Sequence, residues 1–347
     1  MKIAFYAKSL IPIHAKSLEE RAVGGTETGL IRMAEELQKL GHEVYIYGSH
    51  TKPPPSFPKY LPAAEIEKAP EFDIFICIRD WIPCFYKVKT KKIFFWTGDS
   101  YDQFPNYGIG DKRISDRIDA LLCVSHWQAT EISLRSGFPR EKCYILQNGI
   151  HLEHFSGTEN KNPMRLIYSS TPYRGLEFVP ALFYALKTRN PELELHIFSS
   201  YEIYDQTEDP RYSKVKEELA RLPDCHVHTS ILQQDLARKF MKSSILFYPC
   251  HFEETSCITA MEAMAARCVP LTTRLGALPE TIGDAGILID GLPTQDSYNR
   301  EFLTMAHRLL TEEDFRNNLA KKGFERAETM SWKARAKEFE NFMKESL

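Results

Sequence analysis

Short apolar runs alternate with amphipathic stretches along almost the whole chain, and this alternation restricts the fold more than any other feature. In the first part of the sequence, residues 26–40 carry apolar side chains at helical spacing and end at Gly41, and residues 126–135 form a second helical pattern. The apolar runs have the length of buried strands and lie at residues 2–6, 44–47, 73–78, 92–96, 120–124 and 144–147. Strands that alternate with helices in this way predict a parallel sheet covered on both faces.

The alternation begins again after a polar segment of turn formers at residues 153–163. The second set of apolar runs lies at residues 166–169, 193–198, 226–228, 245–248, 269–272 and 287–289, with helical patterns at residues 176–188, 212–221, 234–241 and 257–266. The remainder, from Tyr298, is predicted to be helical with interruptions near Gly323 and Met330. We therefore expect two consecutive doubly wound α/β domains, with ligands beyond the carboxyl ends of the strands and in a cleft between the domains.

The bulk properties exclude several classes of protein. The 347 residues carry a formal net charge of −3, whereas nucleic-acid-binding proteins usually have a strongly basic surface. The eight cysteines form no CxxC pair, so we expect reduced, mostly buried thiols and neither a zinc site nor a disulfide framework. The apolar part of the amino-terminal segment is too short for a signal peptide, and no run has the length of a transmembrane helix. We expect a cytoplasmic protein with at most peripheral membrane contact, and an extended surface loop at the proline-rich residues 52–58.

The first candidate binding element is the pair Gly24–Gly25, at the start of the helix that follows the first strand. Two glycines allow a ligand to approach the backbone closely, and the free N–H groups of a helix start favour an anion. A long loop separates the pair from the strand, which is not the spacing of a dinucleotide-binding G-x-G-x-x-G turn. The alternative is an ordinary helix start capped by Thr26.

The second candidate is Arg174, which follows Ser169 and Ser170 at the first strand-to-helix turn of the second domain. A cation near a helix start opposes the helix dipole, which suggests that an anionic ligand lies between them. A diphosphate fits, because a guanidinium binds phosphate oxygens through parallel hydrogen bonds and the serine hydroxyls add donors. The alternative is an exposed surface arginine.

The third candidate is a strand, loop and helix that carry two glutamates eight positions apart, Glu254 and Glu262. Glu262 lies in an otherwise apolar helix, where a carboxylate needs a partner, and vicinal hydroxyls of a ribose or a sugar are suitable donors. The backbone N–H groups of Thr255, Ser256 and Cys257, at the helix start, are placed to meet a phosphate. The alternative is one solvent-facing glutamate and one that caps a helix.

Four further residues are weaker candidates. Asp99 follows the strand that ends at Trp96 and is expected to point toward the ligand as an acceptor-side carboxylate, although an Asx turn or a helix cap explains it as well. His251, His126 and His154 are candidates for a general base, although a lone histidine is more often structural.

Taken together, these segments resemble glycosyltransferase family four, the retaining glycosyltransferases with the GT-B fold, over essentially the whole chain. The most specific part is the E-x7-E signature at Glu254 and Glu262, which continues as Glu262-Ala-Met-Ala-Ala. The other motifs that match, in the family's order, are Gly24–Gly25, Asn148–Gly149–Ile150, Arg174–Gly175 and GALPE at residues 276–280.

The resemblance implies two facing Rossmann-like domains, with residues 1–155 on the acceptor side and residues 156–328 on the nucleotide-sugar side. A C-terminal helix at residues 329–347 would pack back on the first domain. The implied activity is transfer of a sugar, with retention, from a UDP- or GDP-sugar to a glycan, lipid-linked or other hydroxyl acceptor in surface polysaccharide or glycoconjugate synthesis. The resemblance implies neither a metal nor another cofactor.

By the same resemblance, Arg174 holds the diphosphate, Glu262 binds the ribose hydroxyls and Glu254 faces the donor sugar. The Gly24–Gly25 loop closes over the phosphate, and Arg174, Glu254 and Asp99 form the candidate catalytic set. The nucleobase is expected near Ser200, Tyr201 and Ile231.

Four features depart from the family pattern. Ser169 stands where many members have a second basic residue, and Arg267 stands where a glycine usually follows the E-x7-E helix. Thr255, Ser256 and Cys257 replace the glycine-rich turn after the first glutamate, and residues 97–100 lack the histidine often found there. The alternatives to a transferase on this fold are a nucleotide-sugar epimerase and a non-catalytic nucleotide- or sugar-binding module.

Overall fold

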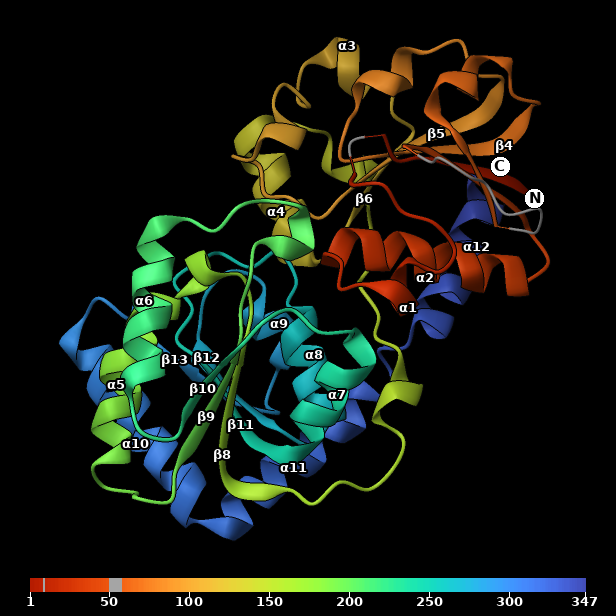
Figure 1. Ribbon diagram of the computed structural model, residues 1–347. Coiled ribbons are helices and arrows are strands. Elements are labelled where there is room, and N and C mark those ends of the chain that lie inside the picture. The colour runs from red at the N-terminus through yellow and green to blue at the C-terminus, as the bar shows by residue number, and fades with distance from the viewer. Residues whose placement is uncertain (9, 50–57) are drawn as a thin grey trace. The chain divides into compact units, whose positions relative to one another are not determined.

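The computed structural model describes residues 1–8, 10–49 and 58–347 (Figure 1). These residues form two compact units: unit 1 contains Met1–Gly149 and Trp332–Leu347, and unit 2 contains Ile150–Ser331. The boundaries therefore lie at 149/150 and 331/332, where the sequence analysis places them at 155/156 and 328/329. The extended loop expected at residues 52–58 lies outside the described residues except for Pro58, which is buried.

Unit 1 is built on a parallel sheet with the strand order β3-β2-β1-β4-β5-β6-β7. Its strands are β1 (Lys2–Tyr6), β2 (Glu43–Gly48), β3 (Lys59–Pro62), β4 (Phe72–Ile78), β5 (Thr90–Thr97), β6 (Ala120–Cys123) and β7 (Cys143–Ile145). The sequence pattern does not predict β3, because this edge strand is short and mostly half-buried. The direction in which strands are added reverses between β1 and β4.

Helices cover both faces of the unit 1 sheet. On one face, α2 (Gly25–Lys39) and α12 (Trp332–Ser346) lie side by side (Figure 1), and their apolar residues share one core with β1, β4 and β5. Gly29 of α2 allows this close approach, because a Cβ atom there would lie 3.1 Å from the ring of Trp332. The opposite face packs against α4 (His126–Ser136). Two short helices complete the unit, α1 (Ser17–Glu20) and α3 (Lys112–Ser115).

Unit 2 is built on a second parallel sheet, with the strand order β10-β9-β8-β11-β12-β13. Its strands are β8 (Asn162–Ser169), β9 (Glu194–Phe198), β10 (Cys225–His228), β11 (Ser243–Tyr248), β12 (Val269–Thr273) and β13 (Ile287–Ile289). The strands β8 and β11 are neighbours at the centre, and the chain adds β9 and β10 on one side of them and β12 and β13 on the other. This reversal marks the position at which open α/β sheets bind their ligands.

Helices also cover both faces of this sheet (Figure 1). On one side lie α5 (Val179–Lys187), α6 (Pro210–Arg221) and α10 (Asp296–Thr311). On the other side lie α7 (Gln233–Lys242), α8 (Ile258–Ala265) and α11 (Glu313–Ala327). The short helix α9 (Leu278–Ile282) follows β12. Parallel sheets covered in this way bury near-continuous apolar strands, and all six residues of β11 are buried.

The interruption predicted near Gly323 is wrong. The helix α11 continues through Gly323 to Ala327, and the helical tail is instead broken at Glu312 and between α11 and α12. A Cβ atom at position 323 would lie 3.2 Å from Cγ of Met264 in α8. Gly323 therefore permits close packing of two helices, which outweighs its low helix propensity.

Two expectations about bulk properties can be compared with the structure. All eight cysteines are free; seven are buried and Cys143 is half-buried, as the apolar context of these residues predicts. In the described part of the chain, no helix combines the length and the apolar character that crossing a bilayer requires.

Candidate functional site

The loops that follow β8 and β11 meet at the reversal point of the unit 2 sheet, and glycines make their contact possible. Gly175 has a φ of +106°, and a Cβ atom there would lie 2.1 Å from the carbonyl oxygen of Pro249. Gly276 has a φ of +57°, and its Cβ atom would lie 2.6 Å from the carbonyl oxygen of Glu254, which also accepts a hydrogen bond of 2.7 Å from the N–H of Ala277. Only glycine fits these positions, because any other residue would be strained by the positive φ and its Cβ atom would collide with a neighbouring carbonyl oxygen. The loop after β11 is therefore packed against the loop after β8 at Pro249 and against the loop after β12 at Glu254.

A buried polar network connects the two loops. Nη1 of Arg174 lies 2.8 Å from each carboxylate oxygen of Glu254, whose exposed fraction is 1%. The hydroxyl of Tyr248, at the end of β11, donates to the same carboxylate over 2.6 Å, and it lies 3.2 Å from the hydroxyl of Ser170. Burial raises the pKa of Tyr248 well above its ordinary value, so this hydroxyl keeps its proton and acts as a donor. Two of the predicted residues, Arg174 and Glu254, are thus brought into direct contact.

Glu254 occupies only part of the Arg174 guanidinium. Both bonds to the carboxylate come from Nη1, and the buried Nε atom has no hydrogen-bond partner among the described residues. The aromatic rings of Phe252 and Tyr173 lie 4.8 and 5.5 Å from the guanidinium carbon and restrict its position. Nη2 donates a long hydrogen bond of 3.5 Å to the hydroxyl of Tyr173, so the unpartnered Nε atom is the part of the guanidinium best suited to a second, anionic partner.

Other buried hydroxyls around these strand ends lack partners within the described residues. They are Oγ1 of Thr171, Oγ of Ser199 and Oγ of Ser256. They follow β8, β9 and β11 respectively, and a buried polar group without a hydrogen bond is costly. Thr255 and Cys257 flank Ser256 and are buried, with Cys257 at the N-cap of α8. The strand ends thus carry unused donors, as expected for the surroundings of a polar ligand.

Glu262 lies inside α8 with an exposed fraction of 6%, and it has a different partner from Glu254. Nε2 of Gln233, the first residue of α7, donates to its carboxylate over 2.7 Å. Burial raises the pKa of Glu262 to about 7, and the hydrogen bond from Gln233 only partly opposes this change. One neutral donor does not compensate a buried carboxylate, so further hydroxyl donors would favour its ionised form.

Replacing Glu262 with glutamine should make the free protein more stable above pH 7. The pKa of Glu262 is about 7 in the folded chain, against an ordinary value of 4.5. Between these values the unfolded chain loses the proton that the folded chain keeps, so stability falls as the pH rises and levels off above pH 7. The upper limit of this loss is about 3 kcal/mol, from about 1.4 kcal/mol per pH unit. Urea unfolding at pH 5 and pH 8 measures it.

The control for this measurement is Glu218→Gln, at an exposed position of α6. We expect the unfolding free energies of wild type and Glu218→Gln to change in parallel between pH 5 and pH 8, and Glu262→Gln to gain stability relative to both as the pH rises. Identical pH profiles for all three proteins would show that Glu262 is ionised in the free folded state.

The residues expected near a nucleobase lie in the loops after β9 and β10. The ring of Tyr201 stacks on Tyr173 with centroids 6.2 Å apart, which links the loop after β9 to the loop that carries Arg174. The hydroxyl of Ser200 accepts a hydrogen bond of 3.0 Å from the N–H of Glu202, and Ile231 is half-buried against the core. Ser169, the last residue of β8, is buried.

In unit 1, Asp99 is paired with an arginine that the sequence analysis does not single out. Both oxygens of Asp99 accept hydrogen bonds from Arg79, at 2.7 Å from Nε and 2.8 Å from Nη2. Arg79 directly follows β4 and has a φ of +53°, an unfavourable conformation for a residue with a side chain. The pair therefore lies at the carboxyl ends of β4 and β5, beside the reversal point of this sheet.

The helix start at Gly24–Gly25 contributes a buried carboxylate to the same region of unit 1. Gly24 is the N-cap of α2 and provides no side-chain cap. Glu27, in the first turn, has an exposed fraction of 2%, and its Oε2 atom is buried without a hydrogen-bond partner among the described residues. Burial raises the pKa of Glu27, although the charges of Arg79 and Arg21 oppose this change. Sequence patterns alone do not identify Glu27, because an acidic residue in a first helical turn is common.

The structure places the three histidine candidates beside residues other than Arg174 and Glu254. His251 lies 3.7 Å from Glu177, and the ring of His154 lies 4.3 Å from that of His151. His126 is the first residue of α4 in unit 1.

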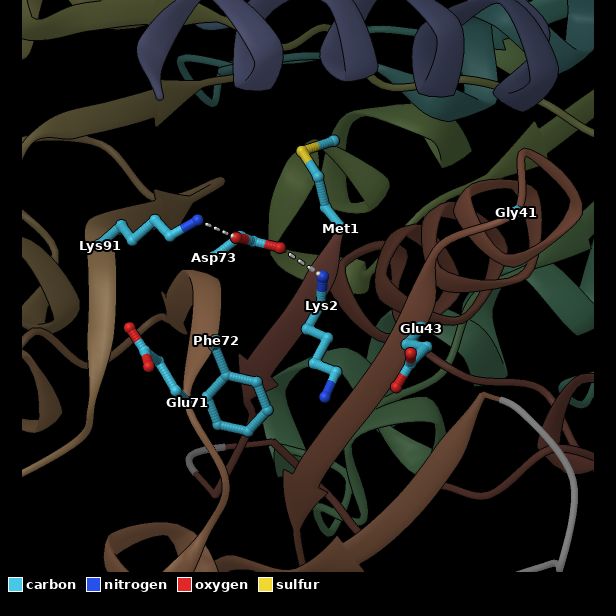
Figure 2. A pocket seen from close by; sticks show the side chains of 8 residues that line it. All are labelled: Met1, Lys2, Gly41, Glu43, Glu71, Phe72, Asp73 and Lys91. Carbon is cyan, nitrogen blue, oxygen red and sulfur yellow. Dashed lines mark hydrogen bonds and ion pairs between the residues drawn. The ribbon is translucent and has the colours of Figure 1, made fainter.

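A surface hollow of about 500 Å³ lies at the amino ends of the strands in the unit 1 sheet (Figure 2). Its lining residues include Lys2, Glu43 and Phe72, which begin β1, β2 and β4. Asp73 lies at its centre, where it accepts hydrogen bonds from Lys91 over 2.6 Å and from the N–H of Lys2 over 2.8 Å (Figure 2). The amino ends of parallel strands are not the edge at which such sheets bind ligands, so we do not assign the hollow to the candidate site.

Comparison with known proteins finds similarity in sequence over about half of the chain. The family model "Glycosyl transferases group 1" matches residues 152–326. The MMP alpha-(1->4)-mannosyltransferase of Mycolicibacterium hassiacum is 27% identical over 177 residues, which are 50% of this chain and 42% of that protein. The chain thus aligns with less than half of this relative.

The similarity in fold extends over both units. A glycosyltransferase from Rickettsia africae superimposes with a TM-score of 0.74 at 14% identity, covering 99% of this chain and 98% of that one. The Anabaena protein HepE, in complex with UDP and glucose, superimposes with a TM-score of 0.75 at 13% identity, covering 99% of this chain and all of that one. The predicted fold class, two Rossmann-like parallel-sheet domains of the GT-B type, is confirmed.

Proposed function

The chain belongs to the group 1 glycosyl transferases, and from this membership we propose that it transfers a sugar, with retention, from a nucleotide-sugar donor to a hydroxyl acceptor. We propose a UDP- or GDP-sugar as donor and a glycan or lipid-linked acceptor in polysaccharide or glycoconjugate synthesis. The relative described as a mannosyltransferase and the Anabaena protein bound to UDP and glucose support this class of substrate.

The main support for the proposal is the set of contacts that the Arg174 guanidinium makes. Glu254 binds the guanidinium at Nη1, and the buried Nε atom has no partner among the described residues, at the ligand-binding end of the unit 2 sheet. Departure of a nucleoside diphosphate concentrates negative charge on the leaving phosphate. A positioned guanidinium lowers the barrier for this step, because it meets the charge as it develops without rearranging.

The surrounding groups extend this anion site. The hydroxyls of Thr171 and Ser256 are buried without partners among the described residues, and the start of α8 presents backbone N–H groups. Together with Arg174 they supply the positive and donor character that a diphosphate requires, and we propose that transfer needs no metal ion for this reason. The acceptor hydroxyl would attack from the side of the leaving group, which gives retention, with the departing phosphate taking its proton.

Glu262 and Gln233 would bind the ribose. A carboxylate accepts from two vicinal hydroxyls, and the buried Oε1 atom of Gln233 has no partner among the described residues. We place the nucleobase at Ser200, Tyr201 and Ile231, beside the stacked pair of Tyr173 and Tyr201.

The residues proposed for the acceptor side are Asp99, Arg79 and Glu27. The carboxylate of Asp99 is already engaged by Arg79, so we propose that it orients this arginine. The unpartnered oxygen of Glu27 is the better acceptor for an incoming hydroxyl. The free backbone N–H groups at the Gly24–Gly25 helix start are suited to bind an anionic group.

The test is binding and transfer with a panel of nucleotides. UDP, GDP and ADP and their sugars are screened by thermal shift, and the release of nucleoside diphosphate is then followed with and without acceptors. A ligand at 100 times its Kd stabilises the folded chain by about 2.7 kcal/mol. We expect a UDP or GDP compound to give such a shift, and Arg174→Gln to weaken its binding by about 10- to 100-fold through loss of a charged hydrogen bond.

Arg189→Gln is the matched control, because Arg189 is exposed in the turn after α5. Its affinity for the nucleotide should equal that of wild type. If none of the nucleotides in the panel raised the melting temperature, the proposed donor would be wrong. Tight binding of a nucleotide without transfer or release would instead support a binding module.

A further inference from the structure

Three histidines and a glutamate lie together on one face of β9 and β10, away from the Arg174–Glu254 network. Glu194 and His196 are two positions apart on β9 and therefore project from the same face. His226 of β10 is the register partner of His196. One ligand atom from each of these three side chains lies within 4.8 Å of the others. Register and alternation thus place two imidazoles and a carboxylate around one point.

The carboxylate of Glu194 is oriented by neighbours that bind one of its two oxygens. Oε1 accepts hydrogen bonds of 2.6 Å from Nε of Arg165 and of 2.6 Å from Nδ2 of Asn162. Oε2 lies 3.7 Å from Nε2 of His196. A carboxylate held through one oxygen, with the other directed at an imidazole, is arranged as a metal-binding carboxylate is.

The ring of His196 is oriented in the same way. Its Nδ1 atom lies 3.0 Å from Nε2 of His228, and its buried Nε2 atom has no hydrogen-bond partner within the described residues. When Nδ1–H donates to His228, the lone pair of Nε2 faces Glu194 and His226. His228 is itself held by stacking on Phe198, with centroids 4.5 Å apart.

We propose that Glu194, His196 and His226 bind one divalent transition-metal cation, Zn²⁺ or a related ion, with water completing the coordination. Two imidazoles and a carboxylate suit Zn²⁺, Co²⁺, Ni²⁺ and Cu²⁺, whereas Mg²⁺ and Ca²⁺ prefer sites made of oxygen ligands. Ligand atoms around tetrahedral Zn²⁺ are about 3.4 Å apart, given bonds of about 2.1 Å. The distance of 3.7 Å between Glu194 and His196 is already close to this value. The exposed side chain of His226 can rotate to complete the site.

The charges around the site permit a dication. The positive charge of Arg165 is balanced by its ion pair with Glu194. Asp224, beside His226, is paired with Lys187, so the charges of these two residues also balance. The bound ion would join the edge strand β10 to β9, whose following loops carry the proposed nucleobase contacts. The metal site does not depend on the proposed transferase activity.

The experiment is titration of the full-length, metal-stripped chain with Co²⁺, followed by visible absorption and by calorimetry. We expect one equivalent to bind with the spectrum of nitrogen and oxygen ligands and without a thiolate charge-transfer band, which separates this site from the eight cysteines. Zn²⁺ should displace Co²⁺, because it stands higher in the stability order, and a large excess of Mg²⁺ should not.

Three variants decide the assignment. His226→Gln, at an exposed position where the fold is not disturbed, should abolish the Co²⁺ spectrum, and His228→Ala should weaken binding by about 10- to 100-fold as a residue that orients a ligand. His307→Gln, at an exposed position of α10, is the control and should bind Co²⁺ as wild type does. The proposal is wrong if no Co²⁺ binds, if the spectrum shows thiolate ligation, or if His226→Gln binds Co²⁺ like the control.

Discussion

Replacing Glu254 with glutamine should lower kcat for sugar transfer by about 10²- to 10³-fold, the size of effect seen when one positioned electrostatic group is lost. The fold should survive, because glutamine has nearly the same shape. In wild type the carboxylate holds Arg174 by two contacts of 2.8 Å and accepts from Tyr248 over 2.6 Å. A neutral amide removes the charge that fixes the guanidinium. Initial rates with saturating donor and acceptor measure the effect.

Glu253→Gln is the matched control, since Glu253 is the adjacent residue, carries the same carboxylate and is exposed. Its kcat should remain within a factor of two or so of wild type, in line with the small effects of most surface changes. Full activity of Glu254→Gln would refute the role of the Arg174–Glu254 pair.

A double-mutant cycle separates two roles of Glu254. If Glu254 acts by positioning Arg174, then Glu254→Gln should cost little more in an Arg174→Gln background, because the two side chains work as one unit. If Glu254 also contacts the donor sugar, the second substitution should cost a further large factor. The apo contacts favour the positioning role, since both carboxylate oxygens are already occupied.

The sequence indicates which residues lie at the candidate site, but it does not indicate which side chains they contact. The alternation of strands and helices places Arg174 and Glu254 in the loops that follow strands, where α/β sheets bind ligands. The sequence analysis assigns Arg174 to a diphosphate and Glu254 to the donor sugar, and it does not predict that the two side chains contact each other. Their contact joins positions 80 residues apart and depends on β8 and β11 being neighbours in the sheet. Strand order is set by long-range packing, which the local pattern of apolar residues does not encode.

The same limit explains the partners of Glu262 and Asp99. The apolar context of Glu262 correctly indicates a buried carboxylate that needs a donor, but Gln233 is an ordinary first residue of an amphipathic helix. Arg79 is one of many charged residues that follow a strand, and its contacts with Asp99 become visible in the structure and not in the sequence. In each case the neighbouring residues in the sequence indicate that the carboxylate is buried. Its hydrogen-bond partner depends on how elements distant in the sequence pack together.

Two glycines have packing roles that the local sequence does not predict. A helical pattern containing Gly323 predicts an interruption, because glycine weakens a helix. The structure instead uses the missing side chain to bring α11 against Met264 of α8. Gly175 serves a similar purpose at the candidate site, where the sequence shows only a basic-glycine pair.

Replacing Gly175 with alanine should destabilise unit 2 by about 3 kcal/mol or more and lower its melting temperature by about 6–12 °C. Two costs combine. A φ of +106° is unfavourable for any residue with a Cβ atom, and the new Cβ would lie 2.1 Å from the carbonyl oxygen of Pro249, which is far inside van der Waals contact. The loop after β8 must therefore move away from the loop after β11 and take Arg174 with it. Differential scanning calorimetry of the free protein measures the stability.

Gly157→Ala separates the two costs, because Gly157 has a φ of +126° and no atom within 4 Å of the added Cβ. This control should show only the conformational cost of about 1–2 kcal/mol. Gly175→Ala should also weaken binding of a nucleoside diphosphate, whereas Gly157→Ala should not, since only the first substitution separates Arg174 from Glu254. Equal melting temperatures for the two variants would mean that the loop after β8 yields without cost. In that case the contact with Pro249 would not be what holds the guanidinium in place.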